Sequence, residues 1–265
     1  MEKKIDKIKI YNYLDYIGKD IKDIIEEISN KIKFNDEIYY AGHEKMEWTK
    51  MSLNRFISNY PNKENIIYPT KEDIHFAINN SELILKKQNG LFDFINIFLF
   101  PCFSDFVREK MNGVTGYCSK EKVILIFINF AGDWKKQLNS TILHELAHSV
   151  SKYYQGGLIS IGEAMIFDGL AEHYRENILN DGKSPLATAL TRIEADKIFE
   201  ELRYKLNSET LKDYTDIFFG TGKYPNWTGY TLGYNLITKF FQGKNNINWY
   251  QILRRDPKDI LKEVI

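Results

Sequence analysis

Residues 144–148 are His-Glu-Leu-Ala-His, a segment whose side chains suit a catalytic metal ion. On a helix, His144 and His148 lie one turn apart on the same face, so both imidazoles can reach one ion. Glu145 lies beside them, where its carboxylate can take a proton from a metal-bound water. The spacing therefore predicts a zinc site in which the two histidines are ligands and Glu145 is the general base.

The residues on either side of this segment predict a single helix from Trp134 to about Tyr154. Its apolar residues recur at helical spacing, and Asp133 is a suitable residue to cap its N-terminus. Gly156 and Gly157 are expected to end it. The alternative interpretation is a surface helix that carries two histidines without a metal.

A catalytic zinc ion generally has three protein ligands and one open position, so a third ligand is needed. A second helix is predicted over residues 161–177, and it contains several acids. Two of them, Asp168 and Glu172, are four residues apart and share a face. One can supply the third ligand, and the other can orient a histidine that binds the metal. The alternative is an acidic face exposed to solvent.

Two further segments have distinctive sequences: residues 158–174 are Leu-Ile-Ser-Ile-Gly-Glu-Ala-Met-Ile-Phe-Asp-Gly-Leu-Ala-Glu-His-Tyr, and residues 227–234 are Trp-Thr-Gly-Tyr-Thr-Leu-Gly-Tyr. Both resemble segments of a bacterial family of predicted zinc-dependent proteases of the gluzincin type. The first resembles the second conserved helix of that family, and the second resembles the start of its C-terminal helix. The resemblance extends over roughly 120–242, and it implies a zinc metallopeptidase that acts on a peptide or protein substrate.

The resemblance also implies roles for particular residues. In the family, an acid-Gly-Leu-Ala-Glu segment follows the second histidine at the spacing that separates Asp168 from His148. This places Asp168 at the ligand position and Glu172 in contact with a ligand. The family has glutamate where this chain has aspartate, so the reverse assignment, with Glu172 as the ligand, stays open. The resemblance further suggests Tyr230 and Tyr234 as catalytic hydrogen-bond donors to the oxyanion.

Apolar runs at 95–100 and 122–130 predict strands before the metal helix. We expect an α+β fold of the zincin-like, gluzincin type. In it, a small, mostly antiparallel sheet precedes the His-Glu-Leu-Ala-His helix and a largely helical C-terminal half follows. Residues 1–68 are expected to form a helical N-terminal region, with an amphipathic helix over 16–33, and 69–265 the catalytic domain. The 122–130 strand or its neighbour is expected to bind extended substrate; the alternative is a buried strand without that role.

The composition narrows the range of functions. Lysine plus arginine equals aspartate plus glutamate, 36 of each, so no net charge attracts nucleic acid or an anionic membrane. No apolar run is long enough to cross a membrane, and none near the N-terminus suggests a signal peptide. We therefore expect a cytoplasmic protein in which Cys102 and Cys118 are thiols rather than a disulfide.

Zinc-dependent hydrolysis of peptide bonds is the preferred functional hypothesis. One alternative is a metal-binding regulatory or scaffolding protein with weak or no proteolytic activity. A structural zinc site would fill its fourth position with a protein ligand, and no cysteine lies near the motif to do so. Another alternative is a hydrolase with the same motif that acts on a non-peptide amide, because pocket shape rather than the metal selects the substrate.

Overall fold

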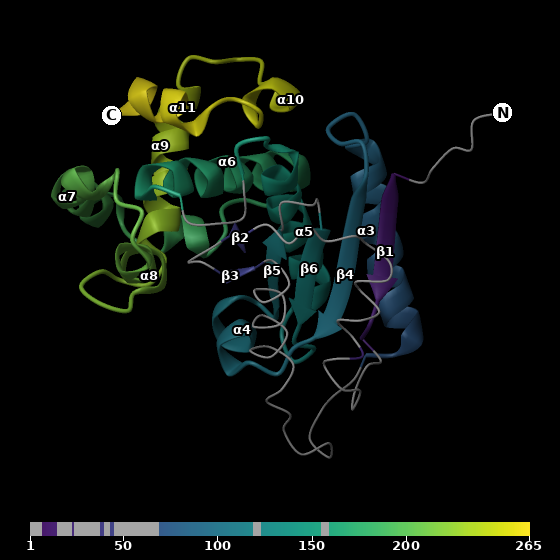
Figure 1. Ribbon diagram of the computed structural model, residues 1–265. Helices are drawn as coiled ribbons and strands as arrows, with labels where there is room; N and C mark the ends of the chain where they lie inside the picture. Colours follow the sequence, from purple (N-terminus) through teal and green to yellow (C-terminus); the bar gives the residue numbers. More distant parts are fainter. Residues whose placement is uncertain are drawn as a thin grey trace. The chain divides into compact units, whose positions relative to one another are not determined.

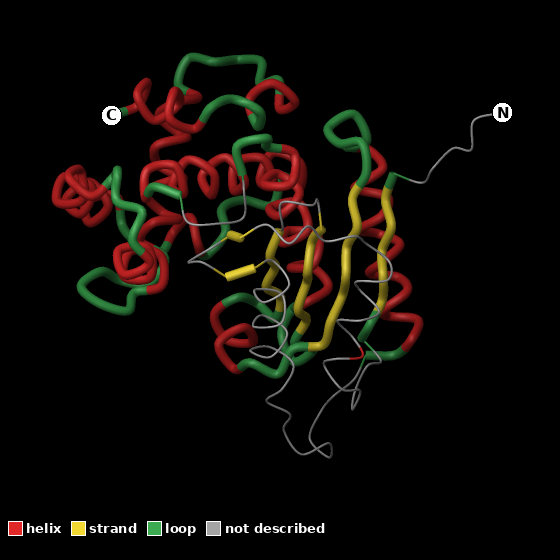
Figure 2. The backbone as a smooth tube through the Cα atoms, viewed as in Figure 1, coloured by secondary structure: helices red, strands yellow, loops and turns green. Residues whose placement is uncertain are grey.

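The structure is a computed structural model that describes residues 7–14, 23, 38–39, 43–44, 69–118, 123–154 and 159–265. The chain divides into two compact units, residues 1–145 and 146–265. The boundary falls inside one continuous helix, α5 (Trp134–Val150). Strands belong to the first unit and the second unit is helical (Figures 1 and 2).

A four-stranded sheet forms the centre of the first unit (Figure 2). Its strands lie in the order β1-β4-β6-β5, with the bounds β1 Ile8–Asn12, β4 Ile95–Pro101, β6 Val123–Ile128 and β5 Val114–Cys118. Strand β4 runs parallel to both β1 and β6, and β5 alone is antiparallel to its neighbour. The sheet is thus mixed, and the prediction of a mostly antiparallel sheet is wrong.

The burial of the two central strands is consistent with their parallel pairing. Every residue of β4 and every residue of β6 is buried, so both faces of the sheet are covered there. Strands of parallel sheets are covered on both faces and therefore lack the alternation of polar and apolar residues that half-exposed antiparallel strands show. The unbroken apolar runs at 95–100 and 122–130 are typical of strands in parallel sheets.

Different elements cover the two faces. On one face, aromatic side chains of β4 and β6 form a cluster with Tyr13 and with Val107 of helix α4 (Asp105–Lys110). Helix α3 (Lys71–Lys87) and helix α5 lie behind the strands in Figure 1. They are joined by a hydrogen bond from Ser81 to Asn139 (2.7 Å) and an ion pair between Lys135 and Asp73 (2.5 Å).

The N-terminal residues differ in part from expectation. Residues 8–12 form β1, a strand that the sequence patterns did not predict, and Ile38–Tyr39 (β2) pairs antiparallel with His43–Glu44 (β3). The amphipathic helix predicted for 16–33 falls, apart from Asp23, outside the described residues. The division at residue 68 stays a prediction.

The second unit confirms the largely helical C-terminal half. Helix α6 (Ile161–Leu179) begins with a capping box in which Ser160 and Glu163 bond to each other's backbone N–H. Helix α9 (Thr228–Phe241) crosses it (Figure 1). The remaining helices are α7 (Arg192–Leu202), α8 (Leu211–Phe219), α10 (Trp249–Ile252) and α11 (Pro257–Val264), with 3-10 turns at Leu186–Thr188 and Arg203–Lys205.

Two glycines let α6 and α9 approach until their backbones touch. A Cβ atom on Gly169 would overlap the carbonyl oxygen of Gly233, and a Cβ on Gly233 would overlap the carbonyl oxygen of Met165. Only glycine leaves space for such a crossing. The helix that carries Asp168 is therefore held by direct backbone contact. In the part of the chain that the structure describes, no helix is both long and apolar enough to cross a membrane.

Candidate metal centre

Helix α5 carries both histidines of the candidate site. It begins at Trp134, as predicted, but ends at Val150, so the prediction that it continues to about Tyr154 is wrong. The cause is Ser151. Its backbone N–H bonds to the carbonyl oxygen of His148 (3.2 Å), three residues back, and its hydroxyl accepts a hydrogen bond from the N–H of Tyr153 (3.3 Å). The chain therefore turns away four residues before the predicted end.

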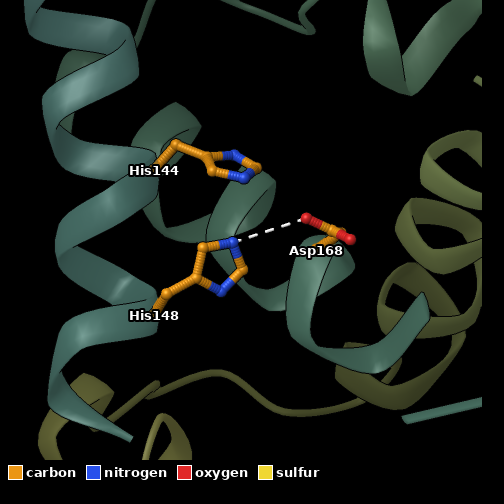
Figure 3. Close-up of side chains that lie close together, drawn as sticks. All are labelled: His144, His148 and Asp168. Carbon is orange, nitrogen blue, oxygen red and sulfur yellow. Dashed lines mark ion pairs between the residues drawn. The ribbon is translucent and has the colours of Figure 1, made fainter. Parts of the chain in front are cut away.

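His144 and His148 extend from α5 toward Asp168 of α6 (Figure 3). Each of these three side chains offers one ligand atom, and the three atoms lie within 4.8 Å of one another. Nε2 of His148 lies 3.4 Å from Oδ1 of Asp168. All three residues are buried, with 8%, 5% and 8% of their surface exposed, so their ligand atoms face each other away from bulk water.

These distances and donor types fit zinc. Two ligands that bind a tetrahedral zinc ion at about 2.0–2.2 Å lie about 3.4 Å apart. The separation of His148 Nε2 and Asp168 Oδ1 already has this value. The other separations do not exceed 4.8 Å, so closing the triangle around an ion needs side-chain shifts on the order of 1 Å. Two imidazoles and one carboxylate are also the ligand types found in catalytic zinc sites.

Glu172 lies one turn further along α6 and is not part of this three-residue cluster. Its Oε2 accepts hydrogen bonds from Nε of Arg175 (3.3 Å) and from the hydroxyl of Ser184. Arg175 also binds Asp181 (2.8 Å) and the carbonyl oxygen of Gly182. Glu172 and Arg175 are only 2% and 3% exposed, so they form a buried ion pair that ties the loop after α6 to the helix.

Glu145, the expected general base, lies against the edge of the sheet. It is 7% exposed. A Cβ atom added to Gly116 of β5 would lie 2.7 Å from Cγ of Glu145 and 2.8 Å from Cγ2 of Thr141. The glycine thus leaves the space that the Glu145 side chain occupies. A glycine inside a strand often marks such a close approach, and this signal in the sequence was missed.

Both cysteines are thiols, as expected, and neither forms a disulfide. Burial raises the pKa of Cys102 to about 11. Burial also raises the pKa of Cys118 well above its usual range, and the negative charge of Glu145 adds to the effect. Cys118 is therefore a neutral thiol.

The two tyrosines named from the resemblance lie in different surroundings. The hydroxyl of Tyr234 donates a hydrogen bond to Oε2 of Glu176 (2.5 Å). Glu176 lies two turns beyond Asp168, about 12 Å along the helix axis, so the Tyr234 hydroxyl is not brought to the metal cluster. Tyr230, in the first turn of α9, is half-buried, and its ring packs edge-on against Phe218 (5.2 Å between centroids).

His173 supports the packing of α6 on α9. Its ring stacks on Tyr234, with 4.1 Å between centroids. Its Nε2 lies 3.1 Å from the carbonyl oxygen of Tyr234 and 3.0 Å from the hydroxyl of Thr238. Burial lowers the pKa of His173. A neutral ring that bonds to the neighbouring helix has a structural role.

Comparison with known proteins adds one match. A family model described as Predicted Zn-dependent protease (DUF2268) matches residues 76–262. That range includes the His144–His148–Asp168 cluster and both helices that carry it. No curated protein and no solved structure matches the chain.

Proposed function

Because the chain belongs to the family of predicted Zn-dependent proteases, we propose that it is a zinc-dependent hydrolase that cleaves peptide bonds. The observation that carries this proposal is the convergence of His144, His148 and Asp168, whose ligand atoms lie within 4.8 Å of one another. The family match covers residues 76–262, and the three clustered residues lie within that range.

In this proposal, His144, His148 and Asp168 would hold the zinc ion. Asp168 is preferred to Glu172 because Oε2 of Glu172 is already held by Arg175 and Ser184, whereas Asp168 faces His148. When bound, zinc supplies a Lewis acid that lowers the pKa of a water and polarises the substrate carbonyl. The three ligands leave one position for that chemistry.

Glu145 would act as the general base and then as the general acid. One carboxylate oxygen takes the proton of the attacking water, and the same group delivers it to the nitrogen of the leaving amine. Glu145 lies next to His144 on α5, and Gly116 lies against its side chain and limits where it can go. Such confinement favours catalysis because the base does not have to be ordered again in the transition state.

The edge strand β5 would bind the substrate. We expect the 122–130 strand or its neighbour to bind extended substrate. Strand β6 has neighbours on both sides, so we propose this role for β5, whose outer edge is unpaired among the described strands. The backbone of an extended peptide can pair with such an edge. Because Gly116 of β5 touches Glu145, a peptide paired there would pass close to the base. This supports a peptide substrate rather than a non-peptide amide.

A further donor would stabilise the oxyanion, and we propose Tyr230 for this role rather than Tyr234. The Tyr234 hydroxyl is bonded to Glu176 and the residue is only 4% exposed. Tyr230 is half-buried, in the first turn of the helix that contacts α6 near Asp168. Removal of the Tyr230 hydroxyl in Tyr230→Phe should lower kcat by about a hundredfold and leave zinc content unchanged.

The proposal is tested with purified protein, its zinc content and its cleavage of a peptide library. Wild-type protein should hold about one zinc per chain and cleave peptides until a chelator removes the metal. Glu145→Gln should keep the zinc and lose cleavage. Glu82→Gln, at a partly exposed carboxylate on α3 that pairs with Lys86, is the matched control and should change neither. Protein that binds no zinc would overturn the site. Zinc-loaded protein that cleaves no peptide would favour the regulatory, metal-binding alternative.

A further inference from the structure

The ring of His148 lies between two aromatic side chains. The ring of Tyr154 stacks on it, with 4.6 Å between centroids and 17° between planes. The ring of Phe167 meets it nearly edge-on, at 6.5 Å and 71°. Tyr154 and Phe167 also contact each other, at 5.4 Å and 81°. The imidazole therefore has one partner on its face and one across its edge.

The local sequence brings these rings together. After α5 ends, Ser151 bonds to the carbonyl oxygen of His148, and the N–H of Tyr154 bonds to the carbonyl oxygen of Ser151 (3.3 Å). These two turns bring the chain back so that Tyr154 reaches the ring of His148, six residues earlier. Phe167 precedes Asp168 on α6, so adjacent residues provide an aromatic contact and a carboxylate to the same imidazole.

We propose that Tyr154 is a positioning residue that acts with Phe167 to fix the plane of the His148 ring for metal binding. This inference rests on the proposed zinc site. An imidazole turns about two single bonds, and a metal ion that binds it must stop both rotations. A ring stacked at 4.6 Å prevents the imidazole from tilting, and the edge of Phe167 limits its sideways movement. Nε2 is then held toward Asp168 before the ion arrives.

The contact differs from the usual way of orienting a metal-binding histidine. In most sites, a hydrogen bond to the second ring nitrogen fixes the direction and tautomer of the ring. Such a hydrogen bond lies in the ring plane, so it restrains rotation of the ring about the hydrogen-bond axis only weakly. A stacked tyrosine restrains that rotation without adding charge. The two aromatic contacts should therefore raise zinc affinity by ordering the ligand beforehand.

The experiment compares the zinc affinity of four proteins by competition with a chromophoric chelator. They are wild type, Tyr154→Leu, Tyr154→Phe and the control Tyr153→Leu. The control removes the adjacent tyrosine, whose ring lies under Lys152 instead. Tyr154→Leu should weaken zinc binding on the order of threefold to tenfold. Tyr154→Phe keeps the stacked ring and should restore the affinity to within about twofold of wild type. Tyr153→Leu should bind zinc like wild type.

Cobalt substitution supplies a second readout. The visible absorption of bound Co²⁺ depends on ligand geometry, so Tyr154→Leu should broaden or shift this spectrum while Tyr154→Phe reproduces the wild-type bands. Thermal unfolding of the metal-free proteins shows whether each variant is folded. If Tyr154→Leu does not fold, Phe167→Leu, which removes the other aromatic contact, takes its place and should weaken zinc binding in the same way.

The outcomes separate this inference from the proposed function. Wild-type protein that fails to bind zinc would remove the metal site itself. Wild-type binding with equal affinity in Tyr154→Leu would overturn the positioning role and leave the metal site intact. An equal loss in Tyr154→Phe and Tyr154→Leu would assign the effect to the hydroxyl rather than to the stacked ring, and it would also contradict the inference.

Discussion

Gly116 lies directly against the side chain of Glu145. A Cβ atom at position 116 would lie 2.7 Å from Cγ of Glu145 and 3.0 Å from its Oε1. Both distances are shorter than ordinary carbon–carbon or carbon–oxygen contacts. The edge strand that we propose for substrate binding and the residue that we propose as general base are therefore in van der Waals contact, and the absence of one methyl group permits it.

Gly116→Ala tests this contact. The new methyl group should push the carboxylate of Glu145 aside by about 1 Å, and a misplacement of this size can lower kcat/KM about a hundredfold. Zinc content should stay at the wild-type level, since no ligand moves. Gly90→Ala is the control, because a Cβ at Gly90 meets nothing within 4 Å. A fully active Gly116→Ala protein would show that the position of Glu145 does not depend on β5.

Gly169→Ala tests the crossing of α6 and α9. Its methyl group would overlap the backbone of Gly233, and the helices must separate to admit it. Overpacking of this kind costs about 1–3 kcal/mol, which exceeds the gain of at most about 1 kcal/mol from the better helix former. Gly162→Ala, on the same helix, meets chiefly a methyl group of the Leu261 side chain, which can move. Urea denaturation should show a larger decrease in the free energy of unfolding for Gly169→Ala than for Gly162→Ala.

The candidate site was largely predictable because its signals are local. The spacing of His144 and His148 defines one helix face, and Asp168 lies on a helix whose Ser160 cap and apolar pattern are contained in neighbouring residues. Segments of this kind fold according to contacts between residues three or four positions apart. The sequence alone therefore indicates which side chains of each helix share a face, and the cluster of three ligand atoms agrees with that prediction.

The strand directions and the aromatic contacts were not predictable in the same way. Strand β1 pairs with β4, more than eighty residues further along the chain, and no local pattern specifies such a partner. The early end of α5 depends on the Ser151 hydroxyl, which competes with the helix for a backbone N–H. The turn after α5 brings the ring of Tyr154 onto the ring of His148. A helix predicted to continue to about Tyr154 does not contain this turn, so the contact could not be predicted.

Arg175→Met tests the buried ion pair with Glu172. The substitution leaves a buried carboxylate without its cationic partner, and breaking such a pair costs about 3–5 kcal/mol. Arg192→Met is the matched control, because the Arg192–Asp196 pair on α7 is exposed and its atoms lie 4.0 Å apart. Chemical denaturation should show a large decrease in the free energy of unfolding for Arg175→Met and no measurable decrease for Arg192→Met. Equal stability of both variants would mean that Glu172 is held by other contacts.

His173 should make stability depend on pH. Burial lowers the pKa of His173 below its value in the unfolded chain, so the unfolded state binds a proton first as the pH falls. Stability should therefore be greatest above about pH 6.5 and decrease toward lower pH, through the pKa of the folded state. His173→Phe keeps the stack on Tyr234 but removes this proton, so its unfolding free energy should fall less steeply between pH 7 and 5. His75→Phe, on the exposed surface of α3, is the control for loss of a histidine. If the unfolding free energy of His173→Phe depends on pH as steeply as that of the wild type, His173 is not the source of the pH dependence.

Zinc affinity should distinguish Asp168 from Glu172. Asp168→Ala removes a ligand atom that lies 3.4 Å from His148 Nε2, and zinc binding should weaken by more than about a hundredfold. Glu172→Gln keeps a similar shape and a hydrogen-bonding oxygen for Arg175 and Ser184, so the loss should be on the order of tenfold. Asp168→Glu restores a carboxylate one methylene longer, and it should recover part of the affinity if α6 can shift to admit it. A larger zinc loss in Glu172→Gln than in Asp168→Ala would reverse the ligand assignment.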